Sequence, residues 1–561
     1  MTDILGADGK LEKTFSAENK LEAKYLQTIK LAWKWEDPRL WDFRRPNLYT
    51  LRLKVDSEGF KDDYPQVFGF REFWIEGRKF LLNGTEFRLR PNLAPDQWGG
   101  NLGSISYIEG CINGMMDVGF NFAELWPWDH DKRGEAHYRE LWAETADRLG
   151  FPMSGVALSV NQYIVNFASW ACIWNDERKA KWTERMTAEM RRYRNHPSII
   201  MWATSANFFG QQQDQNPRFI GMRDYYDKTA KAMAGLDAME IIRKYDPTRP
   251  VFTHHGADIG DVHTCNNYLC MIPLQEREEW ISHWVEKGQM PYIAIEFGTP
   301  LFPTYHRGRC GYGNSIVTEP LYTEWVAAYF GRAGYYRETE EYRHRIIGAF
   351  QGGQLYSSFH ADPVLLKQLH FQDLQDLFIR NTWRSWRTWG LSGGMIPWEN
   401  AQRWTVEAID EVATGNFKPG ARGSYMSSVK KSFLKFYSEE HGWKAYSSGQ
   451  TLVSNNSDTL AWIAGYPQFT DKTHNFISGN STKKQIVLIN DTRTLQSYSF
   501  ECEVIIDGKQ IAKTSGIGEI VPAQNLFVPI EISFPPRLNE KTDGKILLNA
   551  LIGDAKHNDV F

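Results

Sequence analysis

Residues 118–126, VGFNFAELW, form a short apolar run, and residues 137–150, HYRELWAETADRLG, follow as a longer stretch with helical spacing. The alternation returns in WTERMTAEMRRYRN (182–195), SIIMWATSA (198–206) and YIAIEFG (292–298). It extends from about residue 100 to about residue 405. This pattern predicts a parallel α/β unit, and its length suits a (β/α)8 TIM barrel. A doubly wound sheet is the rival, but no GxGxxG or P-loop motif supports it.

Segments rich in β-strand signals flank this unit. Alternating apolar and polar residues around Pro and Asn turns predict short strands from about residue 28 to 56, and residues 68–92 add strands with an Asn83-Gly84 hairpin signal. After about residue 425, the runs QIVLINDT, YSFECEVIIDG and NLFVPIEISF predict a β-sandwich. We therefore predict a partial immunoglobulin-like β-sandwich (1–70), a catalytic barrel (71–424) and a C-terminal β-sandwich (425–561).

The bulk composition narrows the function classes. The 561 residues carry a formal net charge of −4 without a long run of one sign, so neither a nucleic acid nor a membrane is indicated as partner. Aromatic residues make up 14 % of the chain and include 22 Trp. Flat aromatic faces stack on sugar rings, although large aromatics also fill cores and interfaces.

Neither the cysteines nor the amino end of the chain indicates a disulfide framework, a structural metal or a signal peptide. The six cysteines lie far apart, with no CxxC pair, so we expect no disulfide framework, no structural metal and no cofactor. The start, MTDILGADGKLEK, has no apolar core of a signal peptide, and no stretch reaches the roughly 18 apolar residues of a membrane-spanning helix. The expected location is cytoplasmic, or periplasmic or extracellular if the chain is truncated. A homo-oligomer is compatible with the sequence.

One carboxylate stands where a barrel places its chemistry. Glu296 ends the apolar run Tyr292–Ile295 in PYIAIEFGTP. Catalytic residues of (β/α)8 barrels lie at the carboxyl ends of the strands, and a buried carboxylate is costly unless it faces a polar cavity. The alternative is a structural Glu paired with an Arg.

Polar residues follow other predicted strands. Asn207 comes after the strand SIIMW, although an Asn there is usually a turn residue. His254 and His255 lie in THHGADIGDVH (253–263), where they could bind substrate hydroxyls or, with Asp258 and His263, a metal; the spacing matches no common metal motif. His360, in SSFHADP, is a weaker candidate for substrate binding.

Five ordered segments resemble one enzyme family. WDFRRPNLYTLRLKV, FGFREFWIEGRKFLLNGTEFRLRPN, RNHPSIIMW, NNYLCMIPLQ and PYIAIEFG follow the order and spacing of glycoside hydrolase family 2, which includes β-galactosidases, β-glucuronidases and β-mannosidases. The resemblance runs from about residue 28 to 300, and the C-terminal sandwich also fits. It implies a retaining mechanism, in which one carboxylate attacks the anomeric carbon and a second protonates the leaving oxygen.

The resemblance also implies roles for single residues. Glu296 matches the nucleophile, and Tyr268 matches a tyrosine that hydrogen-bonds the nucleophile. Trp398, in GGMIPWEN, matches an aromatic floor beneath the bound sugar. Trp126 and Trp202 are further aromatic candidates for the substrate site. Each aromatic residue could instead belong to the core.

The chain departs from the family at the acid/base. The family reads Trp, three residues, then Asn-Glu, whereas this chain reads WATSANF from Trp202 to Phe208. Without a gap, Asn207 replaces the glutamate; with one inserted residue, Asn207 keeps the sugar-binding asparagine's role and Phe208 replaces the glutamate. Either way the expected proton donor is absent. Glu124 falls where the family often has an arginine and is our candidate replacement.

Several loop charges are further candidates for the missing acid, and each could be a solvated charge. They are Asp129, His130, Asp131 and Asp214. The family also begins with a jelly-roll domain and a complete immunoglobulin-like sandwich, whereas this chain starts partway through what resembles the latter, as either a natural short form or a fragment would. The sequence thus predicts a retaining β-glycosidase for β-linked, galactoside-type oligo- or polysaccharides. The alternative is a catalytically impaired carbohydrate-binding homologue.

Overall fold

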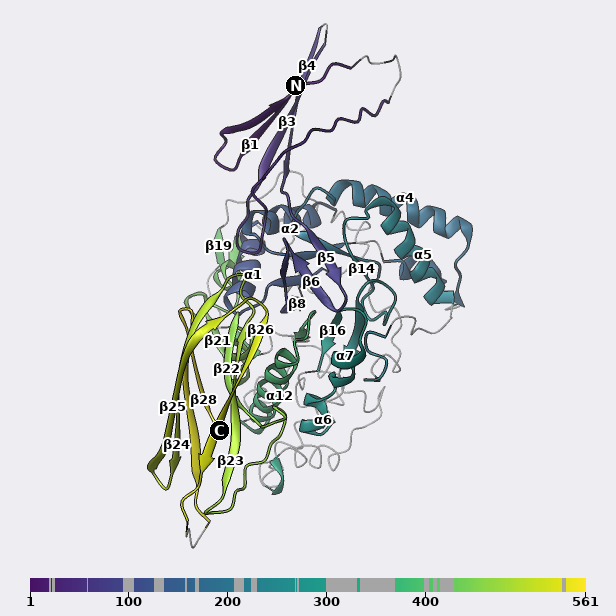
Figure 1. Ribbon diagram of the computed structural model, residues 1–561. Helices are drawn as coiled ribbons and strands as arrows, with labels where there is room; N and C mark the ends of the chain where they lie inside the picture. Colours follow the sequence, from purple (N-terminus) through teal and green to yellow (C-terminus); the bar gives the residue numbers. More distant parts are fainter. Residues whose placement is uncertain are drawn as a thin grey trace.

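The computed structural model describes residues 1–19, 22, 26–57, 59–93, 105–125, 136–156, 159–166, 171–205, 216–222, 230–267, 269, 272–298, 330–332, 369–397, 403–406, 411–413, 428–536 and 541–561. In Figure 1, an amino-terminal sheet stands at the top, helices and parallel strands form the centre, and a β-sandwich lies at the lower left. None of the described helices is long and apolar enough to cross a membrane.

Antiparallel strands form the amino-terminal sheet. Their order across it, for the residues described, is β2 (Leu11–Phe15), β1 (Thr2–Gly6), β3 (Tyr49–Ser57) and β4 (Phe60–Phe68). The sequence pattern predicts strands from about residue 28, but described residues 29–48 hold only isolated bridges. Pro38 and Pro46 lie in this stretch, and neither has an N–H to donate to a strand ladder. The pattern does not predict β1 and β2.

A small sheet leads from there into the central unit. It consists of β5 (Phe73–Glu76), β6 (Lys79–Leu82) and β7 (Thr85–Glu86), all antiparallel. Asn83 and Gly84 connect β6 to β7 with φ angles of 49° and 80°. A two-residue turn with positive φ at both positions matches the twist of a hairpin, and Asn-Gly tolerates it best. The predicted hairpin is therefore confirmed.

Parallel strands form the middle of the molecule. Among the described residues one sheet has the order β14 (Val251–Phe252), β13 (Ile199–Ala203), β10 (Met153–Val156), β9 (Phe122–Glu124), β8 (Pro91–Leu93). A second contains β15 (His263–Asn267), β16 (Tyr292–Phe297) and β17 (Met395–Pro397). At one seam, Leu89 N, just before β8, donates to Ser392 O (2.8 Å), just before β17. At the other seam, Asp261 N, just before β15, donates to Val251 O (2.6 Å) of β14. The two sheets thus continue into one another at both seams.

Helices alternate with these strands. They are α1 (Ile105–Asp117), α2 (Ala136–Leu149), α3 (Asn161–Ile164), α4 (Asp176–Tyr193), α5 (Ala230–Tyr245), α6 (Leu274–Glu278), α7 (Ser282–Lys287) and α12 (Leu369–Thr388). A short hairpin, β11 (Val165–Asn166) with β12 (Ala171–Cys172), follows α3. Asn175 caps α4 by accepting from Arg178 N (3.0 Å). Gly150, with φ of 67°, follows α2, as expected for a left-handed residue after a helix. The predicted alternation of strands and helices is confirmed.

The core of this unit lies between its strands and helices. Every residue of β13 and β16 is buried, and so are the apolar faces of α1 and α4. Short elements follow β17: β18 (Trp404–Val406), β19 (Glu411–Ala413), β20 (Ser428–Lys430), η7 (Lys431–Leu434), η8 (Glu439–His441), β21 (Trp443–Ala445) and α13 (Ser447–Asn456). Gly110 and Gly114 of α1 lie against the backbone of 433–436, where a Cβ would come within 2.1 and 2.4 Å of a carbonyl oxygen.

The C-terminal unit is a two-sheet sandwich, as predicted. Over the described residues one sheet has the order β22 (Thr459–Ala464), β23 (Ser481–Asn490), β26 (Gln524–Ser533). The other has the order β25 (Lys509–Ile520), β24 (Gln496–Ile506), β27 (Gly544–Ile552), β28 (Ala555–Val560). Alternate residues of β24 and β27 are buried, as expected when one sheet face meets the core.

Buried charges join this sandwich to the central unit. Asp491 accepts from Arg387 Nη2 of α12 (2.8 Å) and from Arg88 Nη1 (3.3 Å). Burial alone would raise the pKa of Asp491, but Arg387, Arg88 and Arg90 lower it below its usual range. In Figure 1 the sandwich accordingly lies alongside α12.

Candidate active site

Glu296 lies near the carboxyl end of β16. The strand pairs in parallel with β15 and β17, and its register shifts between Ala294 and Phe297 and, on β15, between Cys265 and Asn266. Gly298 N donates to Asn267 O (2.9 Å), which fixes the backbone just after the carboxylate. Glu296 is 2 % exposed. A carboxylate this deeply buried requires polar partners.

Glu124 ends a strand of the other sheet. It is the last residue of β9, pairs with Leu93 of β8 and is fully buried. Because the strands of the barrel run in parallel, Glu124 and Glu296 lie at the same end of it.

His254 comes from the segment that follows β14. His254 N donates to Ser205 O (3.0 Å), and the hydroxyls of Thr253 and Thr204 are 2.5 Å apart. The loop then folds back, with an antiparallel bridge between Ala257 and Thr264. These bonds hold the backbone on both sides of His254, so its imidazole has a defined position.

The imidazole of His254 lies between the two carboxylates. Its Nδ1 is 2.9 and 3.0 Å from the two oxygens of Glu124, and its Nε2 is 3.2 Å from Oε1 of Glu296. Burial alone would lower the pKa of His254, but the carboxylates of Glu124 and Glu296 raise it to about 9. At neutral pH the ring is therefore an imidazolium that donates one N–H to each carboxylate. We call these three side chains the Glu–His–Glu cluster.

The cluster has the parts of an acid–base and nucleophilic centre. An ionised carboxylate at a strand end can attack an electrophilic carbon, and a histidine in hydrogen-bond contact can move a proton. Burial strengthens the interactions among these charges. The sequence assigned His254 to substrate binding and missed its contacts with both carboxylates. The available signal was the resemblance, which puts Glu124 where the family often has an arginine, together with the place of His254 after a predicted strand.

His255 and His263 are the other histidines of the segment 253–263. His255 is buried and has a φ of 53°. Asp258 and His263 form a separate buried pair, with Oδ1 and Nδ1 2.5 Å apart. No group of three or more His, Cys, Asp or Glu that could hold a metal ion occurs in the described part of the chain.

Trp202 lies away from the cluster. It is fully buried, its indole N–H donates to Asp246 Oδ2 (2.8 Å), and the guanidinium of Arg249 is 5.7 Å from the ring centroid. Gly155 of β10 packs directly against the ring. These contacts give Trp202 a place in the packing of the strands, and none of them reaches Glu296.

Several predicted site residues lie outside the described residues. They are Asn207, Tyr268, Trp398, Trp126 and His360, together with the loop charges Asp129, His130, Asp131 and Asp214.

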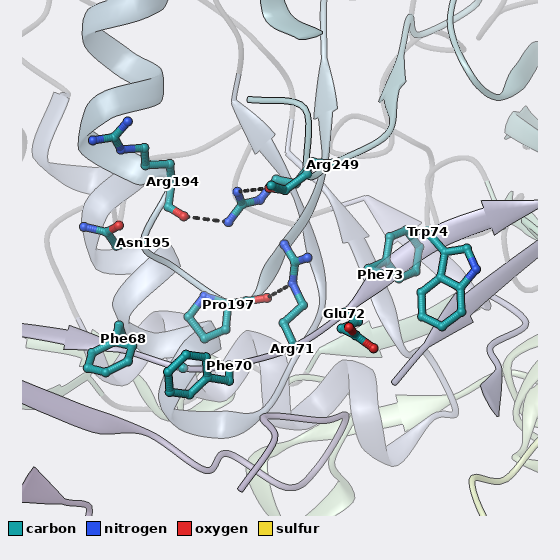
Figure 2. Close-up of a pocket in the computed structure, with 12 residues that line it drawn as sticks. Phe68, Phe70, Arg71, Glu72, Phe73, Trp74, Arg194, Asn195, Pro197 and Arg249 are labelled. Carbon is teal, nitrogen blue, oxygen red and sulfur yellow. Dashed lines mark hydrogen bonds between the residues drawn. The ribbon is translucent and has the colours of Figure 1, made fainter. Parts of the chain in front are cut away.

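A cavity of about 710 Å³ lies elsewhere, beside the starts of β13 and β14. Figure 2 shows Arg71, Arg194 and Arg249 near it, with Phe68 and Trp74 at its ends. Two of these guanidiniums are already bound: Arg249 Nη2 donates to Arg194 O (2.7 Å) and Arg71 Nε to Pro197 O (3.1 Å). The cavity lies at the amino ends of the strands, opposite the Glu–His–Glu cluster.

Comparison with known families identifies the fold unit that holds the cluster. A family model described as glycosyl hydrolases family 2, TIM barrel domain, matches residues 135–345, and one described as glycosyl hydrolases family 2 matches residues 1–71. Together they cover about half of the chain. The chain belongs to glycoside hydrolase family 2. Both the predicted resemblance and the predicted fold class, a (β/α)8 barrel flanked by β-sandwich segments, are confirmed.

Individual family 2 proteins show the same relationship at low identity. A β-galactosidase of Thermoanaerobacterium thermosulfurigenes is 24 % identical over 299 residues, which are 50 % of this chain and 36 % of that protein. A β-glucuronidase of Paenibacillus borealis is 24 % identical over 293 residues, 48 % of this chain and 46 % of that protein. The chain thus spans less than half the length of these relatives.

A solved family 2 structure agrees in fold. The β-D-mannosidase from Dictyoglomus thermophilum superposes with a TM-score of 0.53 at 15 % identity, covering 93 % of this chain and 57 % of that one. This likeness supports the shared fold.

Proposed function

We propose that the chain is a retaining β-glycosidase that hydrolyses β-linked glycosides through a glycosyl-enzyme intermediate on Glu296. The observation that carries the proposal is the buried carboxylate of Glu296 on a barrel strand, 3.2 Å from the imidazole of His254. Family 2 membership supports a glycoside as the substrate.

In the first step Glu296 attacks the anomeric carbon as a carboxylate. Positive charge on His254 favours the ionised form of Glu296, and the hydrogen bond to Oε1 fixes the orientation of the group. The bond from the anomeric carbon to the leaving oxygen then breaks, and water later hydrolyses the glycosyl ester. Glu124 influences this reaction indirectly, because both of its carboxylate oxygens contact the imidazole of His254.

We propose a galactoside-type substrate, an oligo- or polysaccharide. A β-galactosidase is among the relatives, although the relatives also include proteins named β-glucuronidase, and the solved structure is a β-mannosidase. Aryl β-galactosides, β-glucuronides and β-mannosides are therefore the first panel of substrates.

The test is turnover of that panel with proton NMR of the first sugar released. A retaining enzyme releases the β-anomer before mutarotation, and the matched Glu296→Gln variant keeps the shape of the side chain but removes the charge. We expect β-anomer from the wild type and a rate at least 10³-fold lower from Glu296→Gln. Initial release of the α-anomer, or equal rates for the two proteins, would reject the mechanism.

One observation favours a second function. The family's acid/base glutamate is absent at Asn207 and Phe208, so a carbohydrate-binding homologue with impaired catalysis is the alternative. Binding of oligosaccharides in calorimetry without release of phenol from any activated aryl glycoside would support that alternative.

A further inference from the structure

The family's proton donor is missing from the sequence, and the structure holds another proton close to the nucleophile. Among the described residues in contact with Glu296, His254 is one that can carry a proton at neutral pH. Its other nitrogen is bound by both oxygens of Glu124. Glu124 therefore fixes which nitrogen of the neutral ring keeps its hydrogen: Nδ1 stays protonated, and Nε2 is the nitrogen that gains and loses a proton.

We propose that His254 replaces the family's glutamate as the acid/base, with Nε2 as the proton-transferring atom and Glu124 as its positioning partner. This inference rests on the proposed function, because it needs Glu296 as the nucleophile. It assigns to one imidazole–carboxylate pair the work that family 2 gives to a second glutamate.

The hydrogen bond places a proton beside the nucleophile. Nε2 of His254 is 3.2 Å from Oε1 of Glu296. Retaining glycosidases with two carboxyl groups hold these about 5–5.5 Å apart, so the contact is closer here. In this account the leaving oxygen of the substrate takes the place of Oε1 as the acceptor of the Nε2 proton.

The proton balance closes over the two steps. In the first, Glu296 forms a bond to the anomeric carbon, the electron pair of the glycosidic bond goes to the leaving oxygen, and that oxygen takes the proton from Nε2. In the second, water attacks the anomeric carbon and gives a proton to neutral Nε2, while Glu296 departs as a carboxylate. One water is consumed, and the imidazolium is restored.

Charge coupling makes each proton transfer favourable when it is needed. The carboxylate of Glu296 raises the pKa of His254, and this charge disappears when the glycosyl ester forms. His254 thus becomes a stronger acid as the leaving oxygen becomes negative. When Glu296 is released, its charge returns and draws a proton back to Nε2. The charged groups facing the imidazole in the described part of the chain are Glu124 on β9 and Glu296 on β16.

The experiment compares good and poor leaving groups. Wild type, His254→Gln and the exposed control His474→Gln are assayed with 2,4-dinitrophenyl and phenyl β-D-galactosides, and with the corresponding glucuronides and mannosides. Dinitrophenolate needs no proton, whereas phenolate does. For His254→Gln we expect kcat/KM to fall 10²- to 10⁴-fold on phenyl glycosides and by less than tenfold on dinitrophenyl glycosides. Added azide should speed dinitrophenyl turnover by His254→Gln and give a β-glycosyl azide.

A second measurement does not depend on the variant being folded. In the wild type, kcat/KM for phenyl glycosides should fall on the basic side as His254 loses its proton, and dinitrophenyl glycosides should show a much weaker fall. Equal losses on both leaving groups, or identical basic limbs for both substrates, would make His254 a positioning residue and overturn the inference while leaving Glu296 as nucleophile. No dinitrophenol release from the wild type on any of the three sugars would overturn the proposed function and this inference together.

Discussion

Removing the imidazole of His254 should change how the protein's stability depends on pH. In the folded chain the pKa of His254 is about 9, against 6.5 for an ordinary histidine, because Glu124 and Glu296 stabilise the imidazolium. Each unit of difference corresponds to about 1.4 kcal/mol, so the protonation contributes on the order of 3 kcal/mol. Between these two pKa values the folded state binds more protons than the unfolded state. The contribution is therefore fully present below about pH 6.5 and is lost as pH rises through 9.

The assay is urea unfolding followed by tryptophan fluorescence, in steps from pH 6 to pH 9.5, on wild type and His254→Gln. The free energy of unfolding of the wild type should fall relative to that of His254→Gln by about 3 kcal/mol across this range. The His474→Gln control, whose side chain is exposed, should follow the wild type. A difference between wild type and His254→Gln that stays constant from pH 6.5 to 9.5 would refute a charged imidazole in the Glu–His–Glu cluster.

Further predictions concern the packing that holds the site. Asp491→Asn should destabilise the protein by about 3–5 kcal/mol, because it leaves Arg387 and its neighbours buried without a counter-charge. Gly155→Ala should cost at least about 1–3 kcal/mol, since its Cβ would lie 2.3 Å from the ring of Trp202. Asn175→Ala should cost about 1 kcal/mol through loss of the cap on α4. Thermal unfolding measures all three.

Matched controls separate these causes from general damage. Asp8→Asn removes an exposed partner of Lys10 and should leave the unfolding midpoint almost unchanged, so an equally small effect of Asp491→Asn would contradict the buried-charge argument. Trp202→Phe should recover part of the loss in Gly155→Ala; full additivity of the two changes would show that the ring is not the obstacle. Asn175→Asp should retain most of the cap, and a loss as large as that of Asn175→Ala would argue against capping.

Much of the fold could be predicted from local pattern. Apolar runs such as Tyr292–Ile295 and the helical spacing in residues 182–195 predicted β16 and most of α4, because burial on all sides or on one face leaves a periodic signature. The first strands escaped prediction. Residues 2–15 hold no apolar run longer than Ile4-Leu5, and the pairing of β1 with Tyr49–Leu53 depends on contacts about 50 positions away.

The site was predictable residue by residue but not as a cluster. Strand-end position selected Glu296, and a departure from the family pattern selected Glu124. That His254 contacts both could not be read from the sequence, since it depends on how three strands far apart in the chain are arranged around the barrel. Trp202, which was also predicted for the substrate site, packs against Gly155 and donates to Asp246. Within a buried strand, alternate side chains face opposite sides, and the contact of Trp202 with Asp246 shows which side it occupies.

The central claim is that Glu296 is the nucleophile, and trapping of the intermediate tests it most directly. The wild type is incubated with 2,4-dinitrophenyl 2-deoxy-2-fluoro-β-D-galactoside, and with the analogous glucuronide and mannoside, then digested and examined by mass spectrometry. The account predicts one added fluorosugar, located on the carboxylate of Glu296 in the peptide that contains PYIAIEFG. A label on Glu124, or unlabelled protein that nevertheless hydrolyses the parent dinitrophenyl glycoside, would contradict it.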